Sequence, residues 1–148
     1  STLNALTHAF IERWFQFRHQ EGDLLWGKLG VAVGVGGMDG RNPADALDMF
    51  FRYSFIETVA KVIGQGAASC YTCGYGETCK VGVIQMVHGE GTRITPEITP
   101  DVTGQAKVMQ AASGAGRLLG ERLTQGHDRK AVAEKMQQQL MEMMKESA

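Results

Sequence analysis

The feature that most constrains the fold is the segment 29–35, which reads Leu-Gly-Val-Ala-Val-Gly-Val and contains no charged residue. A short apolar run without alternation is typical of a strand buried on both faces, as strands of parallel sheets are. It leads into the glycine-rich turn 36–40, and Asn42 and Pro43 then supply an N-cap and a first helical residue. A strand, a turn and a helix in this order predict an α/β fold.

The rest of the chain predicts few further strands. A parallel α/β sheet usually has about five strands, so we expect this sheet to be incomplete. The strand at 29–35 needs neighbours on both sides, and we expect a second polypeptide or a second copy of the chain to supply them. Helices are expected at about 2–19, 43–60, 102–123 and 129–146, a short strand at 61–64, a strand or extended loop segment at 81–87, and a loop at 92–100.

The chain divides on this interpretation into two parts. Residues 1–126 form the incomplete α/β unit, with a cysteine loop at 66–80, and residues 127–148 form a C-terminal amphipathic helix. The apolar stripe of that helix suits docking on the sheet or on a partner helix.

All three cysteines lie within the loop, at Cys70, Cys73 and Cys79. A C-x2-C pair followed by glycines is how a backbone wraps around a metal ion or an iron–sulfur cluster. Three thiolates leave a tetrahedral site one ligand short, and His88 or a cysteine of a partner are the candidates for the fourth. Zinc and an iron–sulfur cluster both suit such ligands, while a redox-active thiol pair and unpaired loop cysteines are the alternatives.

The composition limits the kinds of binding partner that we expect. The 148 residues carry a net charge of −1, which gives no electrostatic reason to expect nucleic acid or an anionic membrane as partner. No apolar run approaches the roughly 18 residues that a membrane span needs. Three clustered cysteines do not make a secreted disulfide framework, so we expect a cytoplasmic protein.

The ordered motifs resemble a known family. Residues 1–13 read STLNALTHAFIER, residues 27–37 read GKLGVAVGVGG, residues 49–51 read MFF, and residues 115–123 continue the pattern. This series is similar to the second half of the flavodoxin-like NAD(P)H-dependent FMN reductases, which include the iron–sulfur flavoproteins. The family's phosphate-binding loop and the N-terminal cysteine cluster of the iron–sulfur flavoproteins have no counterpart here.

The resemblance implies a flavodoxin-like parallel sheet with helices on both faces, of which this chain provides the C-terminal half. It implies an FMN at the carboxyl end of the sheet, next to Ser1, Thr2 and the turn residues Gly36, Gly37, Met38 and Asp39, and a nicotinamide cofactor as possible hydride donor. From the residues alone, the turn is an ordinary strand-to-helix connection and Ser1 or Thr2 a helix cap.

Two functions of different class follow from these observations. One is an FMN-dependent redox protein, or a subunit of an oxidoreductase, that passes electrons between flavin and a cysteine-ligated iron–sulfur centre. The other is a non-enzymatic assembly or binding module with a structural zinc knuckle at Cys70, Cys73 and Cys79.

Overall fold

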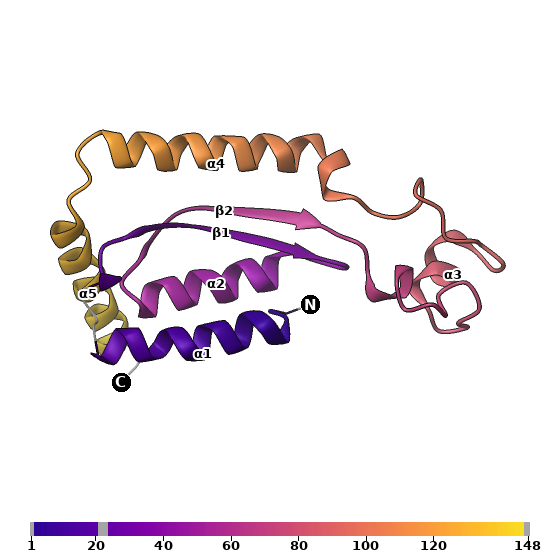
Figure 1. Cartoon of the computed structure of the whole chain (residues 1–148), viewed down its shortest axis with the longest axis horizontal. Helices are drawn as coiled ribbons and strands as arrows, with labels where there is room; N and C mark the ends of the chain where they lie inside the picture. The colour runs from indigo at the N-terminus through magenta and orange to yellow at the C-terminus, as the bar shows by residue number, and fades with distance from the viewer. Residues whose placement is uncertain (1, 21–23, 147–148) are drawn as a thin grey trace.

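The computed structural model describes residues 2–20 and 24–146, and in these ranges it has two parallel strands with helices on both sides (Figure 1). Ser1 lies outside the described residues, as do residues 147 and 148 at the end of the predicted C-terminal part 127–148. The elements are α1 (Ala5–Gln20), β1 (Leu29–Gly36), α2 (Arg41–Tyr53), β2 (Glu57–Gln65), the 3-10 turn η2 (Ser69–Tyr71), α3 (Val83–His88), the 3-10 turn η3 (Val102–Gly104), α4 (Ala106–Thr124) and α5 (Arg129–Glu146).

The sheet is built from one crossover unit. β1 and β2 run parallel, in a register from Leu29 opposite Glu57 to Gly36 opposite Gln65. The connecting helix α2 covers one face and α4 the other, while α1 lies beyond α2 (Figure 1). The Trp14 and Phe50 rings join α1 to α2 with centroids 6.1 Å apart. The predicted α/β class is therefore confirmed for the described residues.

Glycine in β1 allows α2 to pack very closely. A Cβ atom built at Gly34 would lie 2.0 Å from the Gly40 carbonyl oxygen and 2.7 Å from the Ala44 nitrogen, both main-chain atoms. Only a residue without a side chain fits there. The start of α2 is thereby held directly against β1.

Burial of β1 differs from the prediction. Ala32 is fully buried, but the side chains of Val33 and Val35 are 51% and 47% exposed. The valines lie on the face that α4 covers, because Cβ atoms built at Gly64 and Gly66 would contact Val35, and the one at Gly64 would also contact Val108 of α4. Within the described residues, β1 is thus well covered on only one face.

The structure differs from the prediction in the region between α2 and α3. The second helix ends at Tyr53 rather than near residue 60, because Phe55 turns the chain with a positive φ of 54°. The strand that follows then begins at Glu57, earlier than the expected 61–64. The segment 81–87, expected as a strand or extended loop, contains the helix α3 instead.

The residues that cap the helices also differ from the prediction at two places. The residue before α2 is Gly40 and not Asn42, and Asp101 caps η3, so that α4 begins only at Ala106. Asp128 does start α5 as expected, since its Oδ1 accepts hydrogen bonds from the main-chain N–H groups of Lys130 and Ala131.

Residues 66–101 form a separate lobe that leaves the sheet where β2 ends (Figure 1). The lobe has its own small core around Ile84, which is fully buried. Gln85 fastens it from inside, because its amide donates to the Glu77 carbonyl at 2.8 Å and accepts from the Gly91 N–H at 2.7 Å. No described helix is long and apolar enough to cross a membrane.

Candidate functional site

The candidate site lies at the carboxyl ends of β1 and β2, where open α/β sheets bind their ligands. The glycine turn after β1 touches the start of the cysteine lobe there. The Gly66 N–H donates to the Gly36 carbonyl at 2.9 Å. A Cβ atom built at Gly37 would lie 2.4 Å from Ala68 Cα, so Gly37 has to be glycine for the two segments to meet. Two features predicted separately from the sequence are thus neighbours.

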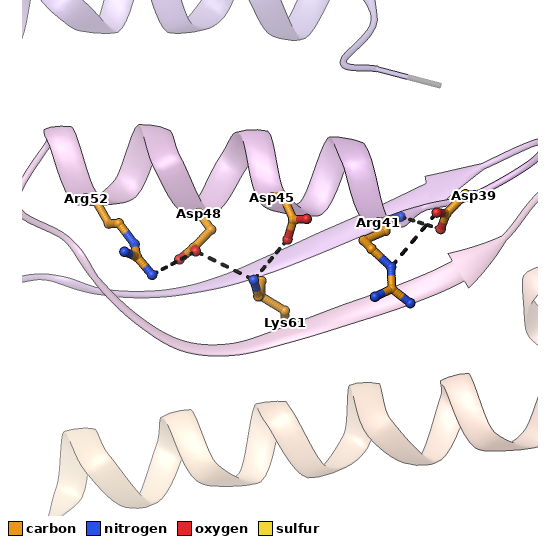
Figure 2. A network of polar contacts seen from close by, with 6 residues as sticks. All are labelled: Asp39, Arg41, Asp45, Asp48, Arg52 and Lys61. Atoms are coloured by element: carbon orange, nitrogen blue, oxygen red, sulfur yellow. Dashed lines mark hydrogen bonds and ion pairs between the residues drawn. The ribbon is translucent and has the colours of Figure 1, made fainter. Parts of the chain in front are cut away.

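Asp39, the charged residue of the turn, stabilises the start of α2. Asp39 Oδ1 accepts a hydrogen bond from the Arg41 N–H at 2.8 Å, and its other oxygen lies 4.0 Å from Arg41 Nε (Figure 2). It therefore satisfies a free N–H group at the start of α2. Met38 is 72% exposed. Thr2 is exposed, and the N-terminal end of α1 lies on the same side of the molecule (Figure 1).

The cysteines sit in a tightly folded part of the lobe and are all free thiols. Gly74 adopts a φ of +82°, which turns the chain so that the Tyr75 N–H donates to Cys73 Sγ at 3.4 Å. A main-chain N–H that donates to a cysteine sulfur commonly stabilises a metal-bound thiolate. Gly76 packs directly on the Cys70 carbonyl, and a Cβ atom built at Gly82 would lie 3.4 Å from Cys79 Sγ.

His88 lies against the same turn. Its Nε2 is 2.9 Å from the Tyr71 hydroxyl, and the two rings meet edge to face with centroids 6.3 Å apart. Tyr71 stands between the first two cysteines in the sequence, so this contact brings the histidine to the C-x2-C turn. A histidine held at one ring nitrogen presents the other one to a ligand.

The donor groups share one lobe but are not gathered around one point. Among the described residues, no three His, Cys, Asp or Glu side chains lie close enough together to hold one metal ion. Cys70, Cys73, Cys79 and His88 therefore stay a predicted ligand set, which would have to close around the metal on binding.

The sequence does not predict the residues that hold the lobe in shape. Glu77 Oε1 accepts from the Ile94 N–H at 2.8 Å, and Gln85 bridges two loops. Their side chains bond to main-chain groups far along the lobe, and no short motif announces such contacts.

A second cavity, of about 650 Å³, lies elsewhere, between the first half of β2 and α5. Several of its charged residues are paired. Glu57 accepts hydrogen bonds from Arg122 and Lys135 at 2.5 and 3.0 Å. Burial alone would raise the pKa of Glu57, but these two bonds and the two positive charges outweigh it and lower the pKa. On the α2 side, Lys61 bridges Asp45 and Asp48 (Figure 2).

We place the candidate site at the carboxyl ends and not in this cavity, because Glu57 and Lys61, which line the cavity, already bind charged partners. The carboxyl ends offer thiols, an imidazole and an open glycine turn, which suit a metal or a planar cofactor better than acid–base chemistry. Comparison of the chain with known protein families, with curated proteins and with solved structures finds no match.

Proposed function

We propose that the chain is an FMN-dependent redox protein, or a subunit of an oxidoreductase, with a cysteine-ligated iron–sulfur centre in the lobe 66–101. The observation that carries this proposal is the direct contact between Gly37 and Ala68, which joins the glycine turn to the entrance of the cysteine lobe. Electron transfer needs its two centres close together, and this contact brings their predicted sites next to each other.

The residues of the chain would position the cofactors and leave the chemistry to them. Gly36, Gly37 and Met38 offer main-chain groups and one exposed apolar side chain to one face of a flavin ring. Cys70, Cys73 and Cys79 would ligate the cluster, with the Tyr75 N–H supporting the Cys73 sulfur. When both are bound, the flavin converts a hydride from a donor such as a nicotinamide into single electrons for the cluster.

The flavin of this proposal would lie on the surface of the protein, against the exposed Met38 of the glycine turn. The α/β arrangement is compatible with part of a flavodoxin-like sheet. The phosphate of FMN needs several N–H or cationic donors, and the resemblance puts these in the first half of the family's fold, which the residues matched here do not include. A second polypeptide supplying that half would complete both the sheet and the flavin site.

The second candidate function is a structural zinc knuckle in an assembly module. It is favoured by the internal core of the lobe, since the buried Ile84 and the Gln85 bonds let the segment keep its shape with little help from the sheet. A structural metal in such a lobe would act as a crosslink between its loops.

Anaerobic purification followed by a visible spectrum and by flavin, iron and zinc analysis separates the two functions. Flavin absorption together with cysteine-dependent iron supports the redox protein, and Cys73→Ser should remove the iron while the control Thr72→Ser keeps it. A colourless protein with one zinc per chain would overturn the redox proposal and favour the knuckle. A chain that holds neither a flavin nor a metal contradicts both.

A further inference from the structure

Two of the three cysteines share one turn of the lobe. Cys70 lies in η2, and Cys73 follows it by three residues. The Cys73 thiol donates a weak hydrogen bond to the Cys70 carbonyl oxygen at 3.7 Å, so the chain turns back between the two residues. The ends of a four-residue turn have Cα atoms less than about 7 Å apart, a separation that a disulfide bridges. Both thiols are free.

Cys79 belongs to the turn that follows. Its main-chain N–H donates to the Tyr75 carbonyl at 2.9 Å. Its side chain packs at the start of α3, since a Cβ atom built at Gly82 would lie 3.1 Å from Cys79 Cβ and 3.4 Å from its Sγ. The partner that Cys73 has within its own turn is therefore Cys70.

The two thiols of the C-x2-C turn differ in their surroundings. Cys73 is exposed and accepts the Tyr75 N–H at 3.4 Å, while Cys70 is half-buried. A sulfur that carries negative charge accepts such a bond more strongly than a neutral thiol does, and the thiolate is the form that attacks a disulfide. This arrangement favours Cys73 as the thiol that reacts first with a molecule from solution, and Cys70 as the thiol that reacts second.

We propose that Cys70 and Cys73 form a reversible disulfide by exchange with a small disulfide of the glutathione type, and that this bond switches off metal binding by the lobe. Formation of the disulfide does not depend on the proposed function. Its control of metal binding rests on the cysteine-ligated centre proposed above.

The exchange takes place in two steps. The Cys73 thiolate attacks one sulfur of the small disulfide, which gives a mixed disulfide and releases one small thiolate. The Cys70 thiolate, its proton lost to solvent, then attacks the Cys73 sulfur, closes the protein disulfide and releases the second small thiolate. The two cysteines are oxidised by two electrons and the small disulfide is reduced to two thiols. Because metals bind the thiolate, two of the three predicted ligands are lost until the reverse exchange restores them.

Mass spectrometry of the full chain, freed of metal by a chelator, tests the pairing. After exposure to glutathione disulfide, acid quenching and alkylation, the wild type should show a bond between Cys70 and Cys73 and an alkylated Cys79. Cys79→Ser is the matched control and should form the same bond. Cys70→Ser should stop at the mixed disulfide on Cys73. A bond that includes Cys79, or a wild type that stops at mixed disulfides, would overturn the pairing.

The rate of the first step tests the role of the turn. Gly74 has a φ of +82°, and a Cβ atom built there meets nothing within 4 Å, so a substitution acts through the backbone alone. Gly74→Ala disfavours the conformation that directs the Tyr75 N–H at Cys73 and should slow the first step about 5- to 30-fold. Gly74→Asn, which tolerates a positive φ, should slow it less. Equal rates in these two variants and the wild type, with unchanged circular dichroism, would contradict Cys73 as the attacking thiolate.

Zinc is the probe for the switch itself. The reduced chain should bind zinc, the oxidised chain should bind it at least about tenfold more weakly, and dithiothreitol should restore the affinity. Equal affinity of the two forms, or no zinc binding by either, would overturn the switch. The disulfide is detected by mass in a chain without flavin or metal, so failure of the proposed redox function is seen separately, in the visible spectrum and the flavin and iron analysis.

Discussion

The substitution Gly76→Ala tests how the cysteine lobe is held together. Gly76 is buried, and a Cβ atom built there would lie 2.1 Å from the Cys70 carbonyl oxygen and 3.0 Å from Ile94 Cδ1. Real Cβ atoms essentially never approach another atom closer than 3.0 Å, so the added methyl has to move the Cys70 main chain by about 0.9 Å, the difference between 3.0 and 2.1 Å.

The oxygen belongs to the main chain and has no rotamer by which to withdraw. Overpacking of this kind costs about 1–3 kcal/mol, which corresponds to a change of about 5- to 150-fold in a local opening equilibrium. The strain falls on the turn that carries Cys70 and Cys73 and not on the sheet. We therefore expect a loosened lobe attached to an intact α/β body.

Hydrogen exchange followed by mass spectrometry measures this directly. Peptides from 70–95 should exchange about 5- to 150-fold faster in the variant, while peptides from β1 and β2 keep their protection. If a metal binds to the cysteines, its affinity should fall by a similar factor. Unchanged exchange in 70–95 would show that Gly76 does not hold the turn, and equal loss of protection in β1 would show that the lobe and the sheet unfold as one unit.

Three further predictions concern other parts of the molecule. Ile84→Ala should cost about 2–5 kcal/mol and act on the lobe, so exchange in 70–95 should rise while the main thermal transition stays in place; a large fall in its Tm would contradict the separate core. Glu57→Gln should lower the Tm at pH 7 by about 2–8 °C, for a loss of about 1 kcal/mol with its exposed cationic partners screened. Because the pKa of Glu57 in the folded protein lies below the ordinary value of 4.5, this stabilisation is present above about pH 4.5 and is lost as the pH falls through the folded pKa. The Tm difference between the variant and the wild type should therefore close in acid. A constant difference, or an equal effect of the control Glu142→Gln, would refute the assignment. Gly114→Ala in α4 meets no atom within 4 Å and should raise stability by up to about 1 kcal/mol, measured as a higher denaturant midpoint.

The sequence predicts the α/β class and the first strand because their signals are local. The apolar run at 29–35 and the Asp128 cap each depend on residues a few positions apart. The end of α2 could not be predicted in this way. Its helical pattern continues past Tyr53, and the chain turns there because Phe55 takes a positive φ, packs on Trp26 with ring centroids 5.0 Å apart, and accepts the Gly27 N–H.

The candidate site was predictable in its parts and not in its arrangement. The cysteine spacing and the glycine turn are visible in the sequence, but the contact of Gly37 with Ala68 follows from the parallel pairing of β1 with β2. The sequence does not decide between strand and helix for the short segment 81–87, because a brief apolar run fits a strand or a buried helix equally well. Gly89, with a φ of +97° just after α3, is the helix-ending signal that could have decided it.

The Gln65–Gln105 amide pair joins two residues 40 positions apart at the base of the cysteine lobe. It makes the lobe a closed insertion, whose entry and exit lie side by side on the edge of the sheet. The entropy of closing a loop rises only slowly with its length, so such an insertion is inexpensive to lengthen, shorten or replace. A chain in which a short glycine–serine linker replaces residues 67–103 should keep the circular dichroism and cooperative melting of the α/β body, and an unfolded product would show that the body depends on the lobe. Because the Gln65–Gln105 pair closes the base of the lobe, the α/β body and the cysteine lobe can each change in evolution without a change in the other.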